Sequence, residues 1–147
     1  MDSTYLTEAC KEDQKVNALF TFLNARLSIP APGQACITLP VSPGLIQGGG
    51  VVAGGILATL ADEAMAHAVM SMPDNEHPTV TAEMNIRYLR SGGPERDGLL
   101  TAVGRVIKSG SALCTAEADV LDEHSRLLAR AGATFYIVQK HDNNYSK

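Results

Sequence analysis

A mostly apolar pattern runs from Ile56 to Met70. The polar side chains within it recur at helical spacings, which places them on one narrow stripe; they are Thr59, Asp62, Glu63 and His67. A helix that is apolar on its other faces is buried in a core or lies in a membrane. Because two adjacent carboxylates at the middle make a membrane span costly, the pattern predicts a buried central helix.

The chain after this helix alternates between apolar and polar residues, which predicts β-strands. Strands are expected at residues 79–89, 99–108, 112–121 and 126–138. In the first of them one face is expected to carry Val80, Ala82, Met84, Ile86 and Tyr88, and the other Thr81, Glu83, Asn85 and Arg87.

Before the central helix, the pattern predicts one amphipathic helix and two short strands. The helix is expected within residues 1–24, from about 6 to 23, and to cover one edge of the sheet. Its apolar stripe consists of Val16, Leu19, Phe20 and Leu23. The two strands, 27–29 and 35–41, flank a turn that contains two prolines and a glycine.

This order of elements predicts an α+β fold in which one curved antiparallel sheet of five to six strands packs on a long central helix. With 147 residues and no repeat or linker, residues 1–147 are expected to form a single domain. The polar residues 141–147 are expected to be a disordered tail. The open edge strand of such a sheet favours side-by-side dimerisation.

Composition argues against several classes of protein. A net charge of −4 does not favour nucleic-acid binding. The three cysteines are odd in number and lack ligand spacing, and the histidines are scattered, so neither disulfides nor a metal site are expected. The first residues resemble no signal peptide. We therefore expect a cytoplasmic protein with no membrane or nucleic-acid partner.

Two features of the central helix point to chemistry. Gly54 and Gly55 leave backbone N–H groups uncovered at a helix N-terminus, where a developing negative charge is stabilised. These glycines also suit a sharp turn with close packing. Asp62 is a carboxylate inside an apolar helix, so it must be paired, for example with Arg87, or functional. His67, one turn beyond Glu63, is expected to be a satisfied core histidine.

These residues belong to longer motifs, which read Gln47-Gly48-Gly49-Gly50-Val51-Val52-Ala53-Gly54-Gly55 and Leu60-Ala61-Asp62-Glu63-Ala64. Together they resemble the glycine loop and helix of the hotdog-fold acyl-CoA thioesterases, in particular the phenylacetate-pathway, PaaI-like type. The likeness continues through residues 80–88 and 130–135 and covers nearly all of the chain after Phe20.

The resemblance implies a hotdog fold and hydrolysis of an acyl-CoA thioester to the free acid and CoA, with no cofactor besides the CoA of the substrate. It implies that the amide of Gly54, with Gly55, holds the carbonyl oxygen and that Asp62 is the general base or the nucleophile. It also implies that Gln47 faces the thioester and that the Thr81 hydroxyl positions water. For Thr81, a β-branched residue in a strand is an equally simple reading.

Helix geometry adds a constraint on the assembly. Gly54 and Asp62 lie eight residues apart, or about 12 Å along a helix. Because one carbonyl cannot meet both groups, Asp62 must act from the partner subunit if both serve one reaction. A homodimer is then required, and the resemblance implies the same shared site, often in a homotetramer.

Other residues are secondary candidates for the site. Ala53 replaces the histidine that the family commonly carries before Gly-Gly, and Gln47 replaces its usual asparagine. Glu63 is the rival carboxylate, although adjacent helical residues point about 100° apart, so only one can face the thioester. Candidate CoA-binding residues on or near the strands, where solvated strand ends are the simpler reading, are Asn85, Arg87, Arg90 and Lys108.

Two other functions remain open. A non-catalytic acyl-CoA-binding hotdog protein would keep the pocket without needing Asp62, but it would normally carry a DNA-binding extension, for which this chain has no room. A hotdog dehydratase or hydratase would need a histidine at the start of the central helix, and Ala53 lies there. The sequence leaves the acyl group open.

Overall fold

The computed structural model describes residues 3–73, 75, 77–92 and 98–139. The elements before the central helix are α1 (Ser3–Ala9), α2 (Ala18–Leu23), β1 (Arg26–Ser28), β2 (Gln34–Pro40) and the 3₁₀ helix η1 (Pro43–Leu45). The central helix and the strands after it are α3 (Gly54–Met70), β3 (Thr79–Tyr88), β4 (Leu99–Ser109), β5 (Leu113–Leu121) and β6 (Leu127–Ile137). Each predicted strand is confirmed with its ends shifted by at most one residue. The tail expected at 141–147 lies outside the described residues.

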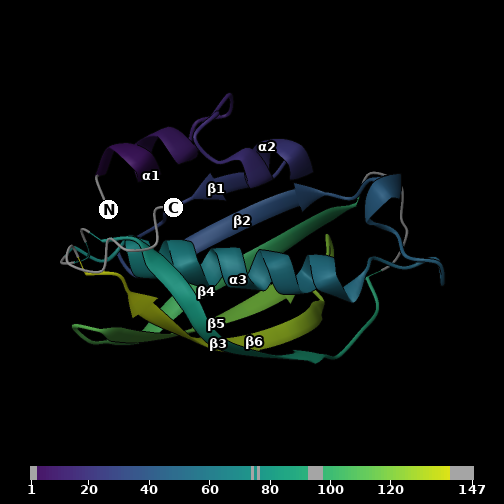
Figure 1. The fold of residues 1–147 in the computed structure, drawn as a ribbon. Helices are drawn as coiled ribbons and strands as arrows, with labels where there is room; N and C mark the ends of the chain where they lie inside the picture. The colour runs from purple at the N-terminus through teal and green to yellow at the C-terminus, as the bar shows by residue number, and fades with distance from the viewer. Residues whose placement is uncertain (1–2, 74, 76, 93–97, 140–147) are drawn as a thin grey trace, which may run out of the picture.

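Within the described chain, six antiparallel strands form one sheet in the order β1-β2-β4-β5-β6-β3. The sheet curves around α3, which lies along its concave face (Figure 1). The alternation in β5 gives this face a row of small buried side chains, namely Cys114, Ala116, Ala118 and Val120. The expected α+β architecture, a long central helix wrapped by a curved sheet, is confirmed.

The helix approaches the sheet most closely at β4. A Cβ atom added to Gly104 would lie 2.3 Å from the carbonyl oxygen of Ala64, so only glycine fits beneath the middle of α3. Around this contact, the large apolar side chains of the helix are fully buried; they are Leu57, Leu60, Met65 and Val69. Burial of one such side chain contributes roughly 1.5–3 kcal/mol, so α3 is firmly held.

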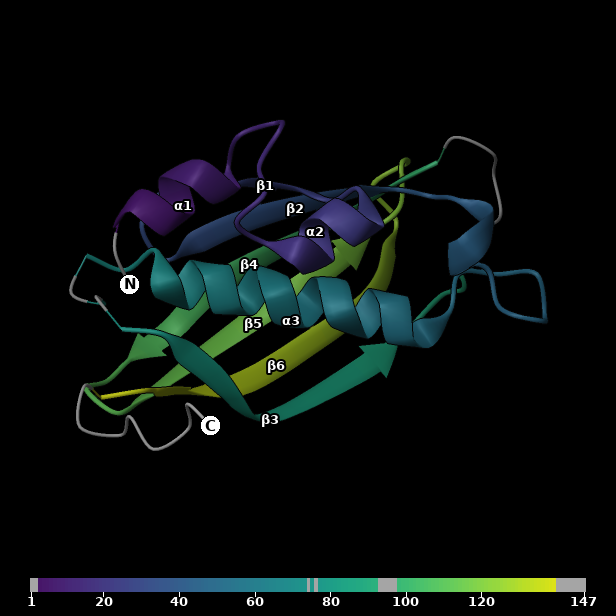
Figure 2. The same cartoon turned by 45° about the horizontal axis from the view of Figure 1, so that its top comes forward.

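The prediction of one N-terminal helix over residues 6–23 is wrong. Two short helices, α1 and α2, are present instead, and they lie over the β1–β2 end of the sheet (Figures 1 and 2). The break arises at Asn17, whose backbone is extended and whose side chain accepts a hydrogen bond from Phe20 N–H. Asn17 is therefore an N-cap that starts a new helix. Of the expected stripe, Phe20 is buried whereas Val16 and Leu19 are exposed.

Hydrogen bonds among three partly or fully buried polar residues, Tyr5, Asn17 and His67, connect this N-terminal segment to α3. The Nδ1 atom of His67 lies 2.7 Å from the carbonyl oxygen of Glu63, and its Nε2 atom lies 3.1 Å from the hydroxyl of Tyr5. Asn17 donates to the same hydroxyl at 3.0 Å. Burial lowers the pKa of His67, which favours the neutral ring. His67 thus lies in the core with both ring nitrogens in contact with polar groups.

The expected division of β3 into two faces is correct after the residue Glu83 and wrong before it. Thr81 pairs with Phe135 and Met84 pairs with Ala133, and both partners are buried beneath α3. Residues that are directly opposite in antiparallel strands point to the same side. A β-bulge between Thr81 and Glu83 therefore changes the phase of the strand. Thr81 faces the helix together with Met84, Ile86 and Tyr88, and does not share a face with Glu83.

Candidate functional site

The start of α3 presents unused backbone donors. Ala53 is the N-cap, and its side chain makes no capping hydrogen bond. Within residues 3–73, 75, 77–92 and 98–139, no acceptor bonds to the N–H of Gly54 or Gly55. Gly55 is exposed, and a Cβ added there would meet nothing within 4 Å. The first turn of α3 can therefore donate to an incoming negatively charged group.

A cavity of about 370 Å³ opens beside this helix start. Its walls come from the glycine loop, α3 and the end of β3, and they include Gln47, Val51, Val52, Gly54, Leu57, Tyr88, Leu89 and Arg90. Three of the predicted site residues, Gln47, Gly54 and Arg90, thus share one cavity. Most of the remaining wall is apolar, which suits a ligand with a polar reacting group and an apolar body.

Gln47 lies in a tight loop before the helix. Its backbone N–H donates to Val51 O and its carbonyl accepts from Gly50 N–H, both at 2.9 Å. Its side-chain oxygen accepts a hydrogen bond from Gly49 N–H. The loop thus holds the amide side chain at the rim of the cavity.

Tyr88 is a member of this site that sequence reasoning missed. Its hydroxyl donates to the carbonyl oxygen of Gly54 at 2.9 Å. Its ring lies 3.3 Å from where a Cβ on Gly54 would be. The sequence shows only an aromatic residue at the end of a strand, and the contact to a residue 34 positions earlier comes from the fold.

Asp62 and Thr81 form a second group. Asp62 is half-buried on α3, and the Thr81 hydroxyl donates to its Oδ1 atom at 2.7 Å. The β-bulge in β3 makes this contact possible, because it lets Thr81 face the helix. A carboxylate with one oxygen fixed in this way keeps its second oxygen for a further proton or ligand.

Glu63 is turned away from this pair. Its Oε2 atom lies 3.7 Å from Nδ1 of His67, on the side of α3 that contacts the N-terminal segment. Burial, and then the neighbouring charge of Asp62, raise the pKa of Glu63 to about 7. Of the two adjacent carboxylates, Asp62 therefore faces strand β3, and Glu63 faces His67 and the N-terminal segment.

Of the expected CoA-binding residues, Asn85, Arg87 and Lys108 do not line the cavity beside Gly54. Asn85 and Arg87 lie on the outer face of the sheet, where they line a separate hollow of about 570 Å³. Lys108 is exposed and lies in β4, opposite Thr115 of β5 and three strands from β3. Arg90 is the member of this group that lines the cavity beside Gly54.

The outer face is held by ion pairs between neighbouring strands. Arg130 contacts both carboxylate oxygens of Asp119, at 2.6 and 3.0 Å, and Arg105 bridges Asp119 and Glu117. The hydrogen bond from Arg130 is the main cause that lowers the pKa of Asp119. These pairs are structural links across the sheet.

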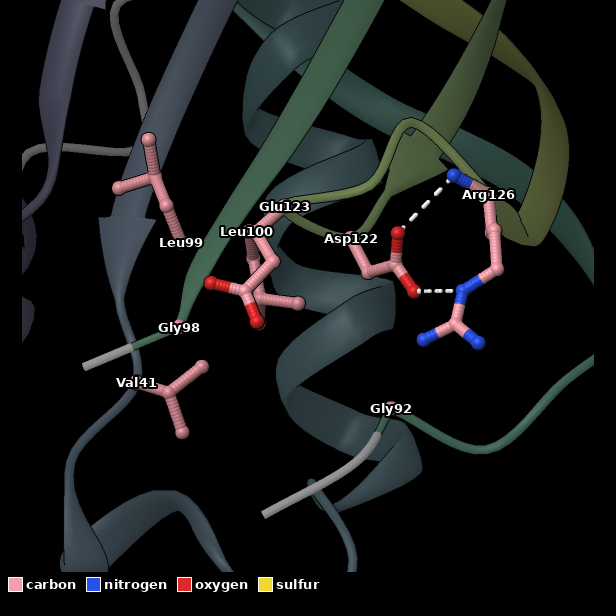
Figure 3. A pocket seen from close by; sticks show the side chains of 8 residues that line it. All are labelled: Val41, Gly92, Gly98, Leu99, Leu100, Asp122, Glu123 and Arg126. Carbon is pink, nitrogen blue, oxygen red and sulfur yellow. Dashed lines mark hydrogen bonds and ion pairs between the residues drawn. The ribbon is translucent and has the colours of Figure 1, made fainter. Parts of the chain in front are cut away.

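A small hollow near the β5–β6 turn contains another carboxylate, Asp122 (Figure 3). Burial raises the pKa of Asp122, but hydrogen bonds from Arg126 and His124 outweigh it and lower the pKa overall. Arg126 donates through its backbone N–H at 2.9 Å and through Nε at 2.7 Å. Asp122 is thus engaged in closing its own turn.

Two further findings concern ligands and membranes. In the part of the chain that the structure describes, no three His, Cys, Asp or Glu side chains lie close enough together to hold a metal ion. No helix there is long and apolar enough to cross a membrane.

Within one chain the two groups are separated. Tyr88 and Gly54 lie at one end of β3, and Thr81 and Asp62 lie toward the other. Figure 2 shows β3 running beside α3 in the opposite direction, so its final residue reaches the start of the helix. Gly54 and Asp62 belong to one continuous helix, about 12 Å apart along its axis.

The fold is similar to those of solved structures of other proteins. It superposes on the Escherichia coli PaaI protein of the phenylacetic acid degradation operon with a TM-score of 0.76, at 23% identity over 84% of this chain and 86% of that one. A conserved protein of Pseudomonas aeruginosa gives a TM-score of 0.75, at 30% identity over 83% and 94% of the two chains. The expected hotdog fold is thereby confirmed.

Sequence comparison agrees with the structural likeness. A Saccharolobus solfataricus protein named as an esterase is 28% identical over 126 residues, which are 86% of this chain and 87% of that protein. The model of the thioesterase superfamily matches residues 49–129, more than half of the chain. This range contains the second motif and all of the first except Gln47 and Gly48, and the chain belongs to the thioesterase superfamily, whose enzymes hydrolyse thioesters.

Proposed function

We propose that this protein hydrolyses acyl-CoA thioesters at two sites, each shared between two copies of the chain. One observation carries the proposal: β3 connects to the helix start through Tyr88 and to Asp62 through Thr81, at opposite ends of one exposed edge strand. Antiparallel pairing of this strand with its copy would bring the start of one helix to the carboxylate of the other.

The edge strand is suited to such pairing. β3 has ten residues, and Val80 and Tyr88 are about half exposed. A long exposed edge with apolar side chains must be covered to avoid unspecific association. A second copy of the same strand provides that cover and keeps the curved sheet continuous.

The charges on β3 favour one register. If the two-fold axis passes through Asn85, Glu83 lies directly opposite Arg87 of the partner subunit, and the pair occurs twice. Opposite charges in such positions stabilise strand pairing. In this register Tyr88 lies opposite the bulge of the partner strand, where Thr81 faces inward. Gly54 then lies beside Asp62 of the partner subunit.

The reaction follows from these positions. The thioester oxygen accepts hydrogen bonds from the N–H of Gly54 and Gly55, and these stabilise the oxyanion that forms when the carbonyl carbon is attacked. The loss of one such donor typically costs roughly 3–4 kcal/mol of activation free energy. The Gln47 amide contacts the substrate from the loop, and Arg90, which lines the same cavity, receives a CoA phosphate.

Asp62 of the partner subunit has two possible roles. As a general base it takes a proton from water, the hydroxide adds to the carbonyl carbon, the C–S bond breaks, and the CoA thiolate receives the proton. As a nucleophile it forms a mixed anhydride as the thiolate leaves, and water then hydrolyses the anhydride. In both, the Thr81 hydroxyl fixes one carboxylate oxygen and helps to position water.

Complementation between two inactive variants tests the proposal. Asp62→Asn removes the base. Gly54→Pro removes the amide donor at the first helical position, where proline is well tolerated. Gly54→Ala is its matched control, because it adds a Cβ near Tyr88 but keeps the N–H. A panel of phenylacetyl, hydroxybenzoyl and aliphatic acyl-CoAs is assayed by release of CoA thiol.

We expect Asp62→Asn and Gly54→Pro each to be inactive alone. A co-refolded mixture of these two variants should regain about a quarter of wild-type activity. Half of the dimers would be mixed, and each would contain one intact site. If native mass spectrometry shows mixed dimers but activity is not regained, the shared site is refuted. Binding of acyl-CoA without turnover by the wild type would favour the non-catalytic binding protein.

A further inference from the structure

The start of α3 has little of its own to hold it in place. Ala53 provides no side-chain cap, and the first two helical residues are Gly54 and Gly55. Glycine favours the helical backbone less than alanine does. A side-chain cap, where one is present, stabilises a helix start. The first turn therefore relies on contacts outside the helix, which include the 2.9 Å hydrogen bond from Ala53 N–H to Leu45 O and the burial of Leu57. The proposed oxyanion donors lie in this turn.

Tyr88 supplies such a contact from the sheet. Its hydroxyl donates to Gly54 O at 2.9 Å, and its ring lies 3.3 Å from where a Cβ on Gly54 would be. Its backbone lies in the β3–β6 ladder opposite Ala129, which is fully buried. Tyr88 therefore connects the first turn of α3 to a buried part of the sheet.

The bonded carbonyl has a second consequence. The peptide group that carries Gly54 O also carries the N–H of Gly55. A hydrogen bond to the oxygen of a peptide group polarises it and strengthens its N–H as a donor. The same contact thus fixes the position of Gly54 and makes the neighbouring amide a better donor.

We infer that Tyr88 is a positioning residue, which holds the Gly54–Gly55 peptide in place to receive the thioester oxygen. This inference rests on the proposed function. It differs from a role in substrate binding, which would act mainly through KM. It also differs from a role in stability alone, which would lower Tm without changing kcat.

The test compares two tyrosines whose hydroxyl groups each form a hydrogen bond with a residue of α3. Tyr88→Phe removes the hydroxyl at the helix start and keeps the ring in the cavity wall. Tyr5→Phe is the matched control, because it removes the hydroxyl beside His67 and lies outside the proposed site. For both variants and the wild type, we would measure kcat, KM, Tm and the affinity for a thioether analogue of the substrate, which lacks the carbonyl oxygen.

We expect Tyr88→Phe to lower kcat about tenfold, with KM and thioether affinity within twofold of wild type. We expect Tyr5→Phe to lower Tm and leave kcat unchanged. An unchanged kcat in Tyr88→Phe overturns the inference, as does a loss that comes only through KM or is matched by Tyr5→Phe. If the wild type hydrolyses none of the panel, the proposed function itself fails.

A second variant covers the case in which Tyr88→Phe does not form a stable dimer. Replacement of Tyr88 by 3-fluorotyrosine keeps the ring and makes the hydroxyl a stronger donor. At a pH where the phenol stays protonated, we expect kcat to rise above that of the wild type. A kcat equal to or below the wild-type value would overturn the inference.

Discussion

Thr81 and Asp62 lie 19 residues apart in the chain and are joined by a hydrogen bond of 2.7 Å. The bond exists because a β-bulge turns Thr81 from the outer face of the sheet to the face that contacts α3. The Thr81 hydroxyl therefore contacts the Asp62 carboxylate directly. The β-branched shape that suits Thr81 to a strand does not account for this contact.

This contact predicts the effect of removing the hydroxyl. Thr81→Ala should lower kcat by roughly 10- to 100-fold, because Asp62 loses the donor that orients it. Thr81→Ser keeps the hydroxyl and should stay within about threefold of the wild type. Steady-state kinetics on the best substrate of the panel would decide; equal activity of the alanine and serine variants would contradict the role.

The proposed register predicts a charge-reversal pair. Glu83→Arg and Arg87→Glu should each weaken the dimer, since like charges would face each other across the two-fold axis. The double variant restores opposite charges and should regain most of the affinity. Sedimentation equilibrium at low and moderate salt would measure this. A double variant no better than the singles would exclude the register centred on Asn85.

Glu63 predicts a pH dependence of stability. Its pKa is about 7 in the fold, raised from 4.5. A carboxyl group whose pKa is raised in the folded state contributes to folding stability. This contribution is fully present below pH 4.5 and is lost as the pH rises through 7. Glu63→Gln should therefore stabilise the protein at pH 8 by up to about 3 kcal/mol, and much less at pH 5.

Urea unfolding of the wild type and Glu63→Gln at pH 5 and pH 8 would measure this difference. His67 also titrates within the range, but its pKa is lowered, so its contribution is lost as the pH falls below 6.5. Comparison of the two proteins at each pH largely separates the two effects. A gain from Glu63→Gln that is equal at both pH values would show that the carboxyl does not change its charge between them.

The contact between β4 and α3 predicts that one glycine cannot be replaced. Gly104→Ala places a methyl group 2.3 Å from the backbone oxygen of Ala64. We expect a loss of more than about 3 kcal/mol of stability, or insoluble protein. Gly132→Ala is the control, because the nearest atom is 3.9 Å from the added carbon. Similar Tm values for the two variants would contradict the close contact.

The sequence was sufficient for the parts of the fold that periodicity controls. The apolar pattern of α3 and the alternation of the strands located these elements within a residue or two. Asp62 stood out because a carboxylate in an apolar helix requires an explanation. The family motifs then linked it to Gly54, Gln47 and Thr81.

Features that depend on one residue or on tertiary contact were not predicted. The bulge adds a single residue to β3, and a period of two does not show where its phase changes. Asn17 is an N-cap within what looked like one amphipathic stripe. Tyr88 meets Gly54 only when β3 folds back along α3, and nothing near Tyr88 in the sequence indicates this contact.

The close contact at Gly104 holds α3 against the sheet at Ala64, which is not the middle of the segment between Gly54 and Asp62 but lies beyond it. If the helix tilted, it would pivot at this contact. The pivot at Ala64 is two residues, about 3 Å, from Asp62 but ten residues, about 15 Å, from Gly54. A small tilt of the helix would thus displace Gly54 about five times as far as Asp62. Substitutions that change this tilt would therefore displace Gly54 first, whereas Asp62 on the same helix would hardly move.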